Sequence, residues 1–174
     1  MAVTTLPRSA MEHIVRKLQT AYPQFRFIAG ATAYWSPRDK SVHYTTNNPY
    51  SLAGLLHELA HGLLAHVTYQ SDIELLHKET AAWDLAQTLA TTYDVSINLD
   101  HVQDCLDTYR DWLHKRSTCP VCHMNGLQTD IHSYSCLNCS HAWRVSGSRF
   151  CRPYRRSAYT KKDRNAVPVL SRFS

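Results

Sequence analysis

The sequence LAGLLHELAHGLLA, residues 52–65, predicts the helix around which the rest of the fold is arranged. Its two histidines, His57 and His61, are four residues apart, so a helix puts both on one face, where they can bind one metal ion. Glu58 is the only residue of the stretch with a formal charge. Burying that charge is costly without a partner, so the apolar flanks favour a metal centre over a helix with merely half-buried histidines. In such a centre Glu58 can deprotonate a metal-bound water.

A third metal ligand is expected beyond this helix, because zinc hydrolases usually use three protein ligands and leave the fourth position to water. Suitable side chains follow at Asp72, Glu74, His77 and Glu79. Glu79 lies on the apolar stripe of the next predicted helix, between Leu76 and Trp83. A carboxylate on a buried face needs a metal ion or a hydrogen-bonding partner. We expect Glu79 to complete a zinc site with His57 and His61, and a buried, hydrogen-bonded glutamate is the alternative.

HELAH, followed by Glu79 in the segment ETAAWDLA, resembles the motifs of the ImmA/IrrE-like family of small metallopeptidases, which combine HExxH with a downstream glutamate helix. The resemblance covers residues 10–115 and has two departures: Ala60 stands where the family commonly has glycine, and His66 follows His61 by five residues rather than four. It implies a zincin-type fold, a zinc endopeptidase activity with Glu58 as the catalytic residue, and a protein substrate. Active members of the family cut cytosolic regulatory proteins, often transcriptional repressors.

Two CxxC pairs predict a second metal site. Cys119 and Cys122 are followed, after thirteen residues, by Cys136 and Cys139, which is the spacing of a four-cysteine zinc ribbon. The Asn125-Gly126 dipeptide predicts a hairpin turn between the pairs. A pair of disulfides in a secreted protein is the alternative, but the N-terminus lacks the pattern of a signal peptide. We therefore expect two zinc ions, one catalytic and one structural, in a cytoplasmic protein.

A peptidase-like domain joined to a four-cysteine ribbon is also similar in layout to the SprT-like proteases, which act on proteins attached to DNA. Those enzymes are expected to use a third histidine as ligand. His77 is the candidate at this position, but Lys78 follows it where that family has glycine. The similarity is therefore one of domain arrangement.

The C-terminal part of the chain is basic. Residues 144–174 carry a formal net charge of +8, whereas residues 1–143 carry −3. Cations that alternate with aromatic rings can attract phosphates and stack on bases. A solvated tail that maintains solubility is the alternative. The candidate nucleic-acid-binding residues are Arg149, Arg152, Arg155, Arg156, Lys161 and Lys162.

The remaining sequence predicts an α+β fold with helices packed on one small antiparallel or mixed sheet. We expect the strand at residues 41–46 to be an edge strand that pairs with an extended substrate. Cys105 is expected in the core and Cys151 as a free thiol. The predicted domains are a zincin-like domain at residues 1–116, the ribbon at 117–146 and a basic tail at 147–174. The predicted elements are a helix opened by Ser9, strands at residues 25–29, 32–36 and 41–46, the histidine helix capped by Asn48, the glutamate helix opened by Ser71, and a closing helix opened by Asp100.

Two classes of function fit these patterns. The first is a zinc metalloprotease that cuts a cytosolic regulatory or nucleic-acid-associated protein, recruited by the ribbon and the tail. The second is a non-catalytic adaptor for nucleic acid or protein, in which the histidine helix only stabilises the fold. No apolar run approaches the roughly 20 residues that span a bilayer, so we expect no membrane partner.

Overall fold

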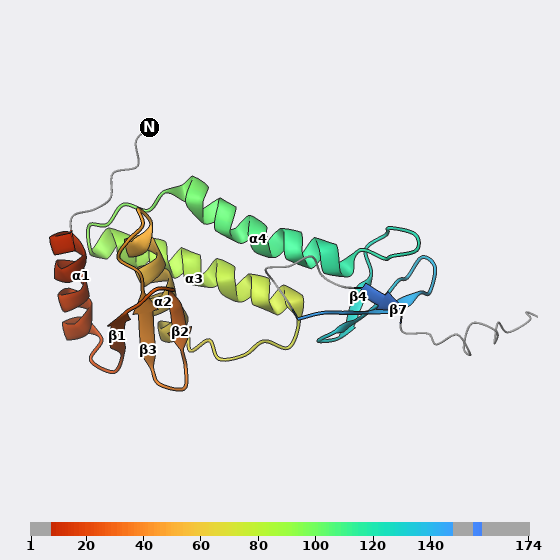
Figure 1. The fold of residues 1–174 in the computed structure, drawn as a ribbon, viewed down its shortest axis with the longest axis horizontal. Helices are drawn as coiled ribbons and strands as arrows, with labels where there is room; N and C mark the ends of the chain where they lie inside the picture. Colours follow the sequence, from red (N-terminus) through yellow and green to blue (C-terminus); the bar gives the residue numbers. More distant parts are fainter. Residues whose placement is uncertain (1–7, 148–154, 158–174) are drawn as a thin grey trace, which may run out of the picture. The chain divides into compact units, whose positions relative to one another are not determined.

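The computed structural model describes residues 8–147 and 155–157 and has an α+β architecture with four helices and two small sheets (Figure 1). The chain divides into two compact units, one comprising the chain up to Tyr69 with Glu74–Leu106, the other Gln70–Ile73 with the chain from Asp107. The predicted boundary after residue 116 stays a prediction. Within the described ranges, no helix is both long and apolar enough to cross a membrane. The elements are α1 (Arg8–Ala21), β1 (Arg26–Ala29), β2 (Tyr34–Ser36), β3 (Ser41–Tyr44), α2 (Ser51–Leu63), α3 (Asp72–Thr92), α4 (Leu99–Ser117), β4 (Leu127–Asp130), β5 (Ser133–Ser135), β6 (Ala142–Val145) and β7 (Arg155–Ser157).

The first unit contains a mixed sheet in the order β1-β3-β2 (Figure 1). β3 pairs in parallel with β1, with Phe27 opposite Val42, and antiparallel with β2, with Trp35 also opposite Val42. The expectation of an edge strand at residues 41–46 is therefore wrong, because β3 is paired on both sides. The edges of this sheet are β1 and β2.

The apolar helix α2 packs against β3 and β2 and forms the centre of the core. Leu55, Leu56 and Leu59 are fully buried, as its nearly continuous apolar sequence requires. The predicted cap at Asn48 is wrong by two residues, because Tyr50 is the N-cap and α2 begins at Ser51. Asn48 instead accepts a hydrogen bond of 2.9 Å from the Tyr50 amide, which closes a turn before the helix.

Helices α3 and α4 begin close to their predicted starts. α3 begins at Asp72, directly after Ser71. The predicted opening of α4 at Asp100 is wrong, because the Asn98 side chain accepts hydrogen bonds from the amides of Asp100 and His101 at 2.8 and 3.3 Å. An asparagine that satisfies two unpaired amides is a strong N-cap, so the helix starts earlier than the sequence pattern suggested.

The second unit contains an antiparallel sheet in the order β4-β5-β6-β7. Its core includes Tyr134 and Trp143, whose rings stack with centroids 5.7 Å apart. The predicted Asn125-Gly126 hairpin turn is wrong. Asn125 forms an isolated bridge with Thr118, and no described glycine has the positive φ that such a turn needs. Gly126 serves packing instead, since a Cβ there would lie 2.4 Å from the Trp143 ring.

A buried ion pair joins the first turn of α3 to the last turn of α4 within this unit. Arg116 donates to the Asp72 carboxylate at 2.5 and 3.3 Å, and both side chains are almost fully buried. Tyr134 donates to the same carboxylate at 2.5 Å. Arg116 also donates to the carbonyls of Ile131 and Ser146. A buried pair is tolerated only when its remaining hydrogen-bonding groups are satisfied, as they are here.

We expect Gly126→Ala to destabilise the second unit by about 1–3 kcal/mol, because the new Cβ would also meet the Ser135 carbonyl oxygen at 2.8 Å. Gly54→Ala is the matched control. It adds a methyl group where no atom lies within 4 Å, inside α2, and we expect it to stabilise the first unit by about 0.5–1 kcal/mol. Denaturant unfolding followed by residue-specific amide exchange measures both changes. Equal effects of the two substitutions would contradict this assignment.

We expect Asp72→Asn to destabilise the second unit by about 3–5 kcal/mol, since it leaves the Arg116 charge buried without a counter-ion. Asp107→Asn is the control, because Asp107 forms an exposed pair with Arg110 and we expect its loss to cost less than about 1 kcal/mol. Amide exchange in β5 and β6 reports the difference. Equal amide exchange in the two variants would show that the buried pair does not stabilise the second unit.

Candidate metal centres

Three side chains from two helices converge in the first unit. α2 contributes His57 and His61 from adjacent turns, and α3 contributes Glu79. The two Nε2 atoms are 3.1 Å apart, and Glu79 Oε2 lies 3.2 Å from His57 Nε2 and 3.5 Å from His61 Nε2. These three atoms form one of two groups in the described part of the chain whose arrangement suits a metal ion.

The separations fit a small cation at the centre of the three atoms. Tetrahedral zinc with bonds of about 2.0–2.1 Å holds its nitrogen and oxygen ligands about 3.3 Å apart. Glu79 Oε2 is buried and makes no hydrogen bond within the described structure. Burial by itself would raise the pKa of Glu79, but its interactions with His57 and His61 outweigh burial and hold that pKa well below the usual range. An ionised carboxylate facing two imidazole nitrogens is a suitable donor set for a divalent metal.

Each histidine is also held from a second side. The His57 ring stacks on Trp83, with centroids 4.2 Å apart. His61 Nδ1 lies 2.8 Å from His66 Nδ1, so His66 contacts the edge of His61 that faces away from the three-atom group. Burial and the nearby His61 lower the pKa of His66, which favours its neutral ring.

Glu58 lies beside this group rather than in it. Its carboxyl interacts electrostatically with His57, His61 and Glu79, and it accepts a hydrogen bond from the backbone of Trp35 in β2. Burial is the largest influence and raises the pKa of Glu58. The two histidines and the Trp35 backbone lower this pKa, but by a smaller amount. The side chain therefore holds a proton more readily than an exposed glutamate, which suits a group that accepts and returns one.

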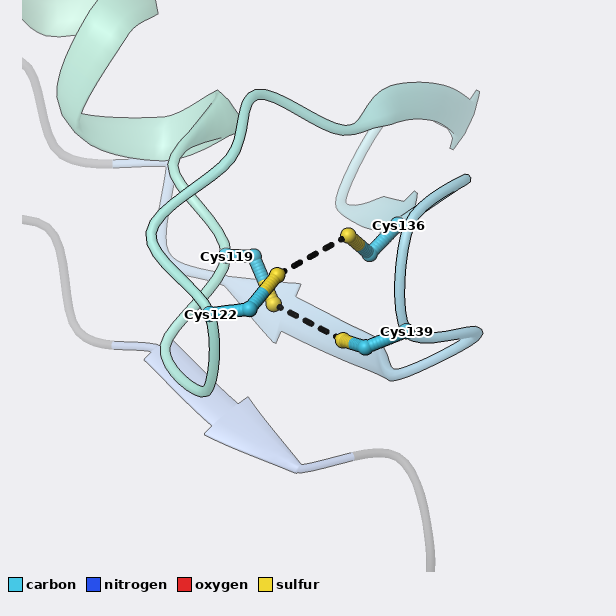
Figure 2. A group of neighbouring side chains, drawn as sticks. All are labelled: Cys119, Cys122, Cys136 and Cys139. Carbon is cyan, nitrogen blue, oxygen red and sulfur yellow. Dashed lines mark hydrogen bonds between the residues drawn. The ribbon is translucent and has the colours of Figure 1, made fainter.

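The four ribbon cysteines form the second group. Cys119 and Cys122 come from the loop after α4, and Cys136 and Cys139 from the loop between β5 and β6 (Figure 2). The sulfur atoms of Cys119 and Cys139 are 3.6 Å apart, and those of Cys122 and Cys136 are 3.4 Å apart. Tetrahedral zinc with bonds of about 2.3 Å holds its sulfurs about 3.8 Å apart, so the cluster fits one ion.

The two cysteine loops repeat the same turn. His123 and Ser140 directly follow the second cysteine of each pair, and both have positive φ, 61° and 58°. The His123 amide donates to the Cys119 carbonyl at 3.1 Å, and the Ser140 amide donates to the Cys136 carbonyl at 3.0 Å. Each loop thus presents its two sulfurs to a common point, as a zinc knuckle does.

The proximity of four thiols makes their joint ionisation unfavourable without a cation. Hydrogen bonds from the Met124 backbone and the Asn138 side chain lower the pKa of Cys122 to about 6. The hydrogen bond from the His141 backbone lowers the pKa of Cys139, but desolvation and the three other thiols together outweigh it and raise that pKa to about 12. All four sulfurs can ionise together only when a bound metal offsets their charge.

The other predicted site residues lie apart from these groups or outside the described structure. His77 is exposed on α3 and belongs to neither group. Cys105 packs against the core of the first unit, as predicted. Arg155 and Arg156 lie on β7, whose backbone pairs with β6, and nothing is described of their side chains. The candidates outside the described residues are Arg149, Arg152, Lys161 and Lys162, together with Cys151.

Sequence reasoning missed the residues that support the two groups. Trp35 contacts Glu58 and also donates its indole N–H to the His66 carbonyl at 3.0 Å, across 31 positions of sequence. Arg116 was likewise missed. One feature of the sequence could have indicated Arg116. It follows Trp112 by four residues and so lies on the same, otherwise apolar, face of the helix.

In comparisons with known proteins, no family model, no curated protein and no solved structure matches this chain. The resemblance to ImmA/IrrE-like metallopeptidases therefore depends on HELAH and Glu79 alone.

We expect the purified chain to hold two metal ions, measured by elemental analysis after gel filtration. Glu79→Gln should remove one of them, because it replaces the ionised oxygen that faces His57 and His61. Cys136→Ser should remove the other. Glu74→Gln is the control for Glu79, since Glu74 pairs with Lys78 on the surface of α3, and it should keep both. Retention of two ions by Glu79→Gln would show that Glu79 is not a ligand.

Proposed function

We propose that this protein is a zinc-dependent endopeptidase of the ImmA/IrrE-like, HExxH-plus-glutamate type. The observation that supports the proposal is the convergence of His57 Nε2, His61 Nε2 and Glu79 Oε2 within 3.5 Å of one another, with the Glu58 carboxyl beside them. Three protein ligands leave one tetrahedral position free, which distinguishes a catalytic from a structural zinc site. The helix order and the mixed sheet next to α2 are compatible with a zincin-type domain.

Zinc is the favoured ion for both groups. Two imidazoles with one carboxylate, and four thiolates, are ligand sets that tetrahedral zinc accepts. At the first group, zinc would lower the pKa of a bound water to about 7 and polarise a peptide carbonyl.

Glu58 is the residue that moves the proton. Its carboxyl lies next to the metal ligands, it is oriented by the backbone of Trp35, and burial raises its pKa towards the working range of a general base. It would take a proton from the attacking water and return it to the leaving amine. The peptide itself would be bound by the surfaces around Glu58.

An extended peptide would pair with β2 rather than with β3. β2 is an edge of the sheet, and its Trp35 contacts Glu58, whereas β3 is paired on both sides. Backbone pairing along such an edge aligns a peptide without requiring a particular sequence. This arrangement fits a protein substrate, and we propose a cytosolic regulatory or nucleic-acid-associated protein.

The ribbon and tail would recruit this substrate. Between Ser117 and Gly147 the ribbon has only Asp130 and Arg144 as formally charged residues. Attraction to DNA or RNA would therefore come from the basic residues that follow the ribbon, since phosphate binding depends on cations.

We expect Glu58→Gln to keep both metal ions and to reduce peptide cleavage by about 10²-fold or more, because the amide cannot accept the proton. Asp84→Asn on α3 provides a control that should cut normally. The measurement is mass-spectrometric identification of new protein termini in a cell extract incubated with each variant. Unchanged cleavage by Glu58→Gln would contradict the proposed chemistry.

The same variant separates the enzyme from the adaptor. An inactive Glu58→Gln protein should retain its substrate, so co-purification identifies the protein that is cut. If Glu58→Gln leaves the cellular phenotype unchanged while Cys136→Ser removes it, the adaptor function replaces the proposed one.

A further inference from the structure

His66 is placed to orient one of the candidate metal ligands. His61 directs Nε2 towards His57 and Glu79, and its other nitrogen, Nδ1, lies 2.8 Å from His66 Nδ1. The group of converging ligand atoms does not include His66, so this histidine lies behind the ligand rather than in the site.

The short contact requires one shared proton, and metal binding by His61 decides which ring carries it. Two imidazole nitrogens at 2.8 Å share one proton, with one nitrogen donating and the other accepting. When the lone pair of His61 Nε2 is used for a metal, a neutral His61 carries its proton on Nδ1 and donates it to His66. His66 then accepts through Nδ1 and carries its own proton on Nε2. Such an acceptor fixes both the tautomer and the ring orientation of a metal-binding histidine.

The backbone of His66 is anchored on both sides of this contact. Its amide donates to the His61 carbonyl at 3.0 Å, and its carbonyl accepts the Trp35 indole N–H at 3.0 Å. Ala65, just before it, has a φ of 52°, which turns the chain back towards α2. A non-glycine residue in this region is unfavourable, so the turn is maintained by the contacts around it.

Gly62 makes room for the anchor. A Cβ at this position would lie 3.2 Å from the Trp35 ring and 3.3 Å from the Phe25 ring, so its absence lets the indole pack on α2. From there the indole reaches the His66 carbonyl, while the Trp35 backbone contacts Glu58. One residue of β2 therefore supports both the loop behind His61 and the side chain of Glu58.

We propose that His66, anchored by Trp35, is a positioning residue that accepts the Nδ1 proton of His61 and so orients His61 for metal binding. The proposal rests on the metal centre proposed above. It assigns a role to a histidine that is not itself a ligand, and it makes Trp35 the link between the metal ligand and Glu58.

The test measures zinc affinity in the full-length protein by chelator competition, with the ribbon zinc as an internal reference. His66→Leu should weaken the His57–His61–Glu79 site by about 10–100-fold and leave the ribbon unchanged. His66→Asn should retain most of the affinity, because its side-chain oxygen can accept the same proton. Trp35→Phe, which keeps the ring and removes the indole donor, should weaken the site in the same direction. His77→Leu, on the exposed face of α3, should have no effect.

Histidine nitrogen shifts in the zinc-loaded protein give a second readout that a merely structural role would not produce. We expect an unprotonated Nδ1 and a protonated Nε2 on His66. A proton on His66 Nδ1, or unchanged affinity in His66→Leu, overturns the positioning role and leaves the metal centre intact. If the wild-type chain holds only the ribbon zinc, both the metal centre and the role of His66 are wrong. Two bound zinc ions without peptide cleavage would reject the peptidase alone.

Discussion

The buried carboxylate of Glu79 is the constraint on which the first unit depends. An ionised group inside an apolar core is stable only next to an opposite charge or a metal. His57 and His61 face it from α2, with their Nε2 atoms 3.2 and 3.5 Å from Glu79 Oε2 and 3.1 Å from each other. The side chain thus requires α2 and α3 to meet at one point, and the leucines of α2 fill the space around it.

The three converging side chains are supported by residues around them, on α3, on β2 and in the loop after α2. Trp83 covers His57, His66 lies behind His61, and Trp35 is connected to both His66 and Glu58. Metal sites need such surrounding contacts, because ligand rings that rotate freely bind weakly. A sheet placed beside α2 therefore does more than cover its apolar face. It orients the groups that would carry out chemistry.

The second unit also combines a candidate metal site with a buried charged side chain, on a smaller scale. Its apolar core is small, and a unit of this size usually needs a metal or another cross-link to be stable. Four cysteines form a candidate metal site, and the Asp72–Arg116 pair supplies a buried polar contact between distant segments. The Trp143 indole also donates to the Arg116 carbonyl at 2.9 Å, so the ion pair and the ribbon core are joined.

The sequence by itself determined the features that depend on local spacing. HELAH and the two CxxC pairs specified which histidines and cysteines lie together, because a helical turn and a knuckle loop fix geometry within a few residues. Helix caps were predicted less well, since several residues near a helix start can occupy the cap position: Tyr50 rather than Asn48 precedes α2, and Asn98 rather than Asp100 caps α4. Gly126 was misread as a turn because its constraint is the Trp143 ring, which is distant in sequence. Only the tertiary structure decided that β3 is central, that Trp35 reaches His66, and that Asp72 meets Arg116 across 44 positions. Such contacts depend on chain segments that meet only in the folded state, and no local pattern records them.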